Sequence, residues 1–209
     1  MRPSTITSHY LDLQRQLHKR PDYGTASLLF AATVEKVMKH YQLSSISDYG
    51  AGKQNLLRGL QELGFQPSNY FPYDPVFPEY GKPKPADLVC CIDVLEHIEL
   101  KRLNNVLNEL AVITTKMGFL SIHMGPAVKV LADGRNAHLI QKPSSWWLPR
   151  IARRFEVVEL HCHEMAGQGI WLIVKPKTPS PSLKQRFQNW LSSTRTRLII
   201  WKHPNFKPN

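Results

Sequence analysis

The sequence has few cysteines, few acidic residues and no long apolar run, and each shortage argues against a class of protein. Of its three cysteines, Cys90 and Cys91 are adjacent in a predicted buried strand and Cys162 stands alone, so there is no disulfide framework and no zinc spacing. No apolar run approaches the roughly 18 residues that cross a membrane, and residues 1–5 lack the apolar centre of a signal peptide. We therefore expect a cytoplasmic protein with one sizeable core.

Acidic residues are outnumbered by basic ones, and the imbalance is concentrated near the end of the chain. The formal net charge is +11, and no Asp or Glu follows Lys175. Residues 176–182 are rich in proline and serine and read as a linker, and residues 183–201 read as a basic amphipathic helix. This tail predicts contact with an anionic membrane surface or a nucleic acid. The alternative is an extension that is solvated or packs on its own domain.

Two glycines follow a short β-prone segment, and they are the most informative feature of the chain. The segment 44–48 leads into Gly50 and Gly52, and a helix-compatible run follows at residues 54–63. Glycines let a ligand approach the backbone closely, and a helix N-terminus favours polar or anionic groups. A dinucleotide site is disfavoured because Asn55 stands where the GxGxxG fingerprint requires its third glycine.

Two further segments place acids after apolar runs. Asp74 lies about two dozen residues beyond the glycine turn, where an acid typically accepts hydrogen bonds from ribose hydroxyls. The run Ala86-Asp87-Leu88-Val89-Cys90-Cys91-Ile92-Asp93 has the pattern of a buried strand, and it enters a helix through Val94-Leu95-Glu96-His97-Ile98. The order of these segments predicts alternating strands and helices with a ligand at the carboxyl ends of the strands.

In this order the segments resemble class I S-adenosylmethionine-dependent methyltransferases. The turn Asp48-Tyr49-Gly50-Ala51-Gly52 resembles the first motif of that family, and Asp93-Val94-Leu95-Glu96-His97-Ile98 resembles the fourth. The resemblance implies an α/β fold, a Rossmann-like three-layer sandwich whose mostly parallel sheet has an antiparallel last strand. It also implies S-adenosyl-L-methionine as cofactor, S-adenosyl-L-homocysteine as product, and a Tyr-Gly turn that closes over the methionine end. The cofactor residues so implied are Tyr23, Gly24, Asp48, Tyr49, Gly50, Gly52, Lys53, Asp74, Pro75, Asp93, Val94 and Leu95.

One segment departs from the family pattern. Only residues 75–85, with four prolines, separate the second predicted strand from the third, which is too short for a helix plus a strand. We therefore expect a sheet reduced at its third-strand edge. The expected helices are 8–18, 25–41, 54–63, 100–114 and about 146–155, and the later strands are 87–93, 118–123, 155–163 and 169–174. The expected organisation is N-terminal helices covering the cofactor site at 1–42, a methyltransferase domain at 43–176 and the basic linker and tail at 177–209.

The predicted loop after residue 123 carries the best candidates for acceptor binding. Within six positions it places Asp133, Arg135, Asn136 and His138. Long loops in compact domains are often functional, a guanidinium suits carboxylate or phosphate, and an imidazole suits proton removal. We assign His138 as the general base, with His123 at the preceding strand end as the second choice. The alternative is a polar turn with a capping acid and a surface arginine.

Three other aromatic side chains are candidates for the acceptor side. His97 lies one helical turn beyond Asp93, where it either ties the helix to the cofactor loop or contacts substrate. Trp146 and Trp147 open a helix and serve either as an aromatic wall for a sugar or base, or as core.

Metal binding is not expected. His161 and His163 share one face of a strand, but no carboxylate or cysteine has supporting spacing.

The sequence therefore favours a methyltransferase that methylates a hydroxyl of a sugar or another small polar, anionic acceptor, including a lipid-linked glycan. A nucleic-acid methyltransferase tethered by the basic tail is the second hypothesis. Base N-methyltransferases often carry an Asn/Asp-Pro-Pro-Tyr/Phe run after the family's fourth strand. The run Asp93-Val94-Leu95-Glu96, which stands there in this chain, does not match that pattern. A non-catalytic domain that binds the cofactor and a partner is the third. The oligomeric state is left open.

Overall fold

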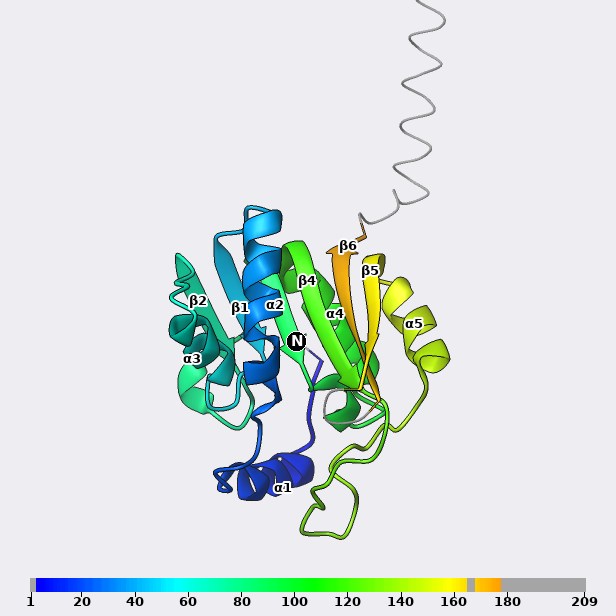
Figure 1. Ribbon diagram of the computed structural model, residues 1–209. Helices are drawn as coiled ribbons and strands as arrows, with labels where there is room; N and C mark the ends of the chain where they lie inside the picture. The colour runs from blue at the N-terminus through cyan, green and yellow to red at the C-terminus, as the bar shows by residue number, and fades with distance from the viewer. Residues whose placement is uncertain (1–2, 165–167, 178–209) are drawn as a thin grey trace, which may run out of the picture. The chain divides into compact units, whose positions relative to one another are not determined.

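The computed structural model describes residues 3–164 and 168–177, which form a six-stranded sheet with helices on both faces (Figure 1). The predicted basic tail lies outside the described residues. The strands are β1 (Ser45–Tyr49), β2 (Asn69–Tyr73), β3 (Ala86–Ile92), β4 (Thr114–His123), β5 (Phe155–His163) and β6 (Gly169–Pro176). The helices are α1 (Ser8–His18), α2 (Ala26–His40), α3 (Asn55–Glu62), α4 (Leu103–Ile113) and α5 (Ser144–Ala152), with short 3-10 helices η1 (Pro78–Tyr80) and η2 (Leu95–His97).

The sheet has the order β2-β1-β3-β4-β6-β5. The first four strands of this order pair in parallel, and β6 runs antiparallel to both of its neighbours. This confirms the predicted mostly parallel sheet. Strand β2 forms one edge of the sheet, and β5 forms the other. The proline-rich segment after β2 contains only η1 as regular structure. The predicted reduction at that edge is therefore confirmed.

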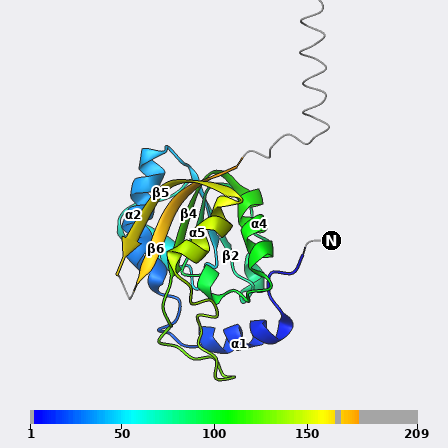
Figure 2. The ribbon, with the colours of Figure 1, turned by 90° about the vertical axis from the view of Figure 1, so that its right-hand side faces the viewer.

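Two hydrophobic clusters pack on the two faces of the sheet. Helices α2 and α3 cover one face, where Val34, Leu56 and Phe119 are buried together. Helices α4 and α5 cover the other face, where Leu107 and Trp147 are buried with residues of the central strands. Figure 2 shows the two helical layers on either side of the sheet. The arrangement is the predicted three-layer sandwich.

Helix α1 lies across one end of the sheet rather than on a face (Figure 1). Its side chains Tyr10, Leu13 and Leu17 pack with Leu131 and Ala137 from the connection between β4 and α5. The N-terminal segment and this long connection therefore meet over the carboxyl ends of the parallel strands, where open α/β sheets bind ligands.

Strand β4 begins earlier than its predicted start at residue 118. Gly118 lies inside the strand, and a Cβ added to it would come within 2.8 Å of Val174 Cγ2. The glycine therefore permits close packing of β6 rather than marking the start of the strand. None of the described helices is long and apolar enough to cross a membrane.

Candidate functional site

The glycine turn after β1 is bonded tightly to the end of β2. The amides of Gly50 and Ala51 both donate to the Tyr73 carbonyl, at 2.7 and 3.0 Å. Gly50 has φ +83° and Gly52 has φ +49°, and a Cβ on Gly50 would lie 2.3 Å from Val94 Cγ2. The turn therefore requires glycine both for its backbone angles and for its close approach to the segment after β3.

A cavity of about 340 Å³ opens beside this turn. It brings together residues predicted from six separate segments of the sequence. The predicted residues that line it are Tyr23, Gly24, Tyr49, Gly50, Gly52, Asp74, Pro75, Asp93, Val94, His97, His123 and His138.

Asp74 is fixed in the cavity wall by two backbone amides. Its Oδ2 accepts from Gly52 at 3.0 Å and its Oδ1 accepts from Val76 at 2.8 Å. Burial raises the pKa of this carboxyl, while the two amide bonds act in the opposite direction. A carboxylate has about four acceptor positions, so Asp74 can accept further bonds from hydroxyl groups of a ligand.

Three of the predicted cofactor residues do not line the cavity. Asp48 is buried and accepts a hydrogen bond from the Tyr70 hydroxyl. Lys53 is exposed and donates to the Arg20 carbonyl. Leu95 is completely buried in the core against α4. Asp48 and Leu95 are therefore part of the buried interior, and Lys53 ties the glycine turn to the chain after α1.

In the predicted acceptor loop, two of the polar residues lie at the surface and a third holds the loop in shape. Asp133 and Arg135 are exposed and paired with each other, with Nη2 and Oδ2 2.6 Å apart, and neither lines the cavity. The Asn136 side chain accepts from the amides of Ala127 and His138, both at 2.9 Å, and donates to the Ala127 carbonyl. Asn136 therefore holds the loop in the shape that brings His138 to the cavity.

The tryptophan pair belongs mainly to the protein interior. Trp147 is fully buried in the core, with Nε1 donating to the Lys142 carbonyl at 3.1 Å. This corrects the expectation of an aromatic wall at Trp147, because a core side chain cannot face a ligand. Trp146 is half-buried, does not line the cavity, and lies under the Arg150 guanidinium at 3.6 Å.

Three imidazoles gather at one side of the cavity. The ring centroids of His97 and His138 are 4.7 Å apart, and those of His123 and His138 are 4.8 Å apart. His97 Nδ1 is 2.9 Å from the Ala137 carbonyl, and His138 Nδ1 is 2.8 Å from the Gly125 carbonyl. Because a carbonyl only accepts, each Nδ1 carries the proton and each Nε2 keeps its lone pair.

Burial favours the neutral form of two of these imidazoles. It lowers the pKa of His97 to about 4, and it also lowers the pKa of His138, where the hydrogen bond to Gly125 and the Asp93 carboxylate act in the opposite direction. Both rings are therefore uncharged at neutral pH.

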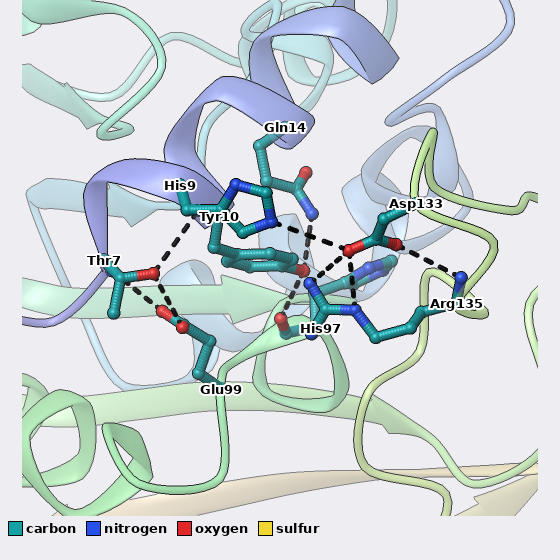
Figure 3. A network of polar contacts seen from close by, with 8 residues as sticks. All are labelled: Thr7, His9, Tyr10, Gln14, His97, Glu99, Asp133 and Arg135. Carbon is teal, nitrogen blue, oxygen red and sulfur yellow. Dashed lines mark hydrogen bonds and ion pairs between the residues drawn. The ribbon is translucent and has the colours of Figure 1, made fainter.

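The sequence analysis missed three polar residues at this site. Gln14 and His18 line the cavity from α1, and Glu96 is completely buried behind it. The Gln14 amide donates to the Tyr10 hydroxyl, which donates to the His97 carbonyl, both at 2.6 Å (Figure 3). The helical periodicity of α1 places residues 10, 14 and 18 on one face. A search for polar residues on the apolar face of this helix would therefore have found Gln14 and His18, but not Glu96.

The protonation of Asp48 gives a prediction about stability. Burial raises the pKa of this carboxyl from 3.8 to about 7, so the folded protein holds a proton that the unfolded chain has lost between these values. Stability contributed by this group therefore falls as the pH rises from about 4 to 7. We expect Asp48→Asn to become more stable relative to wild type over this interval, by up to about 1.4 kcal/mol per pH unit.

Urea unfolding at pH 5 and pH 8 measures this difference. Asp12→Asn serves as the control, since Asp12 is exposed and its only ion pair among the described residues is a surface pair with Arg15. If the free energies of unfolding of Asp48→Asn and wild type change in parallel between these pH values, Asp48 is ionised in both the folded and the unfolded state, and the prediction is wrong.

Comparison with protein-family models and with curated proteins finds no match. Solved structures do match. One is 1,6-didemethyltoxoflavin-N1-methyltransferase of Burkholderia thailandensis with bound 1,6-didemethyltoxoflavin and S-adenosylhomocysteine, with a TM-score of 0.57 and 14% identity over 84% of this chain and 92% of that chain. Another is magnesium protoporphyrin IX methyltransferase of Synechocystis PCC 6803 with bound SAM, with a TM-score of 0.52 and 13% identity over 81% and 92%. The chain has the fold of these methyltransferases.

Proposed function

We propose that the protein is an S-adenosylmethionine-dependent methyltransferase of class I. The observation that carries this proposal is the cavity in which the glycine turn, Asp74 and Asp93 meet, at the ends of three neighbouring parallel strands. Gly50 and Gly52 give a ligand close access to the backbone, and Asp74 is held where it can accept bonds from ribose hydroxyls. The shared fold with methyltransferases that bind the same cofactor supports this assignment.

Tyr23 is proposed to cover the methionine end of the cofactor. It lines the cavity from the turn between α1 and α2, and its hydroxyl donates to Gln14 Oε1 at 3.1 Å. The Gly24 carbonyl accepts from the Asn55 side chain at 2.7 Å, which ties this turn to the start of α3. These contacts hold the N-terminal segment over the site and exclude water from it.

The acceptor is proposed to be a hydroxyl group of a small polar molecule. The acceptor oxygen forms a bond to the methyl carbon while the carbon–sulfur bond of the sulfonium breaks, which yields a methyl ether and S-adenosylhomocysteine. His138 is neutral, lines the cavity and keeps the Nε2 lone pair, so it can take the hydroxyl proton. His123 lies beside it as the second candidate base.

The cover over the site supports a small acceptor over a nucleic acid. Helix α1 and the loop after β4 pack against each other and both line the cavity, which leaves less room for a large acceptor than an open groove would. The basic tail, which motivates the membrane and nucleic-acid hypotheses, lies outside the described residues.

A radiolabelled-methyl assay tests the proposed function. The full chain is incubated with methyl-labelled cofactor and separate pools of sugars, sugar phosphates, glycolipids, RNA and DNA. We expect label in a sugar or other small hydroxyl acceptor. Label confined to nucleic acid, lost on raising the salt concentration, would favour the tethered nucleic-acid enzyme. Cofactor binding without transfer to any pool would favour the non-catalytic domain.

A further inference from the structure

Three side chains with metal-binding atoms meet in the cavity, although no metal site is expected from the sequence. Asp93 follows β3, His97 ends η2, and His138 lies in the loop after β4. One ligand atom from each lies within 4.8 Å of the others. We propose that Asp93, His97 and His138 bind a divalent first-row transition-metal ion.

The two imidazoles are already oriented as metal ligands. In metal sites a ligating histidine usually donates its other N–H to a carbonyl or carboxylate, which fixes the tautomer and the ring. His97 does so to the Ala137 carbonyl and His138 to the Gly125 carbonyl. Each ring therefore presents an unprotonated Nε2.

A buried carboxyl beside the cluster has one oxygen without a hydrogen-bond partner among the described residues. Glu96 lies in η2, between Asp93 and His97 in the sequence, and is completely buried. Glu96 Oε1 accepts from the His123 amide, but Oε2 has no hydrogen-bond partner among the described residues. No described lysine or arginine forms an ion pair with either carboxylate. A divalent cation bound by Asp93 would supply the positive charge that the described residues do not provide here.

The backbone at Asp93 adds an independent observation. Asp93 has φ +57°, a conformation that residues other than glycine adopt at a cost. Its amide donates to Ser121 Oγ at 3.0 Å, which fixes the residue at the junction of β3 and β4. The left-handed conformation turns the chain sharply after the strand and sets Asp93 in the cavity wall beside the two histidines.

The donor set indicates the class of ion. Two imidazoles and one carboxylate suit Zn²⁺, Fe²⁺, Co²⁺ or Mn²⁺ better than Mg²⁺ or Ca²⁺, which prefer oxygen ligands alone. All three ligands line the cavity, so the remaining coordination positions face it and can hold water or a ligand oxygen.

The role of the ion, unlike its binding, rests on the proposed function. An acceptor hydroxyl bound to the ion would have a lowered pKa and would release its proton more easily. His138 would then act as a metal ligand, and no longer as the base.

Metal binding is measured on the full chain without an affinity tag and without methyl donor or acceptor, so its outcome is independent of the proposed function. Chelator-treated protein is titrated with Zn²⁺, Mn²⁺ and Co²⁺ by calorimetry, and the Co²⁺ complex is followed by its visible absorption. The variants are Asp93→Asn, His97→Asn and His138→Asn. The exposed His40→Asn, at the end of α2, is the matched control.

We expect one ion per chain in wild type and in His40→Asn, and at least about tenfold weaker binding in each of the three cluster variants. We also expect saturating ion to raise the Tm of wild type and of His40→Asn, with a smaller rise for Asp93→Asn. Absence of binding to wild type would overturn the proposal, whatever the folding of the variants. Equal affinity in wild type and all three cluster variants would place the ion elsewhere and would overturn it as well.

Discussion

Replacing Gly50 by alanine is expected to abolish cofactor binding. A Cβ at this position would lie 2.3 Å from Val94 Cγ2, far inside van der Waals contact, so the glycine turn or the segment after β3 must move. Both segments line the cavity on which the proposed cofactor site depends. We expect the affinity for S-adenosylhomocysteine to fall by at least about 100-fold, or about 2.8 kcal/mol, by calorimetry.

Gly64→Ala separates this effect from simple backbone strain. Gly64 also has a positive φ, +72°, but a Cβ there would meet nothing within 4 Å, and it does not line the cavity. An alanine with left-handed backbone angles lowers the free energy of unfolding by about 1–2 kcal/mol, so both variants should unfold at a lower temperature. Only Gly50→Ala should lose binding. An equal loss in the two variants, or none in Gly50→Ala, would contradict the proposed position of the cofactor.

His138→Asn is expected to reduce methyl transfer by about 100- to 10,000-fold, the usual contribution of a positioned base. The asparagine amide can still donate to the Gly125 carbonyl in place of Nδ1–H. Asparagine has no atom at the position of Nε2, so it cannot take the proton there. Because burial lowers the pKa of His138, wild type should keep its activity to a pH below the usual histidine value of about 6.5. Rates on the acceptor found by the labelled-methyl assay measure both effects.

His40→Asn is the control for this substitution and should leave the rate unchanged. Chelation distinguishes the two roles open to His138. If His138 is the base, chelator-treated wild type keeps its activity. If His138 is a metal ligand, the activity of chelator-treated wild type falls toward that of His138→Asn. Full activity of His138→Asn, with or without chelator, would exclude both roles.

The order of the elements could be predicted because each strand and helix has a clear local pattern. Strand β3 is a nearly continuous apolar run that ends just before Asp93. Strand β1 is a short β-prone segment that ends just before the turn with Gly50 and Gly52. The prolines after β2 exclude a further helix and strand there, which is why the reduced edge could be predicted.

The composition of the cavity was predictable only in part, because it depends on contacts between distant segments. The turn carrying Gly50 and the acid Asp74 follow a local pattern of strand and turn. In contrast, the local pattern places Gln14 and His18 on the apolar face of α1 but does not show what that face covers. Their position at the cavity results from contacts between α1 and the loop after β4.

The dense polar loop misled the sequence reasoning about which side chains face the cavity. Arg135 is satisfied by Asp133 at the surface, and Asn136 is used to hold the loop. Only His138 of this loop motif reaches the cavity. Adjacent helical residues point in different directions, so Trp147 enters the core while its neighbour Trp146 stays half-buried.

Titration of the wild-type protein with S-adenosylmethionine and S-adenosylhomocysteine by calorimetry tests the central claim most directly. The account predicts binding of one molecule per chain with micromolar affinity, abolished by Asp74→Ala and retained by Asp87→Asn, whose carboxylate caps the far end of the sheet at Ser44. Absence of binding to the wild-type protein, or binding unaffected by Asp74→Ala, would contradict the account.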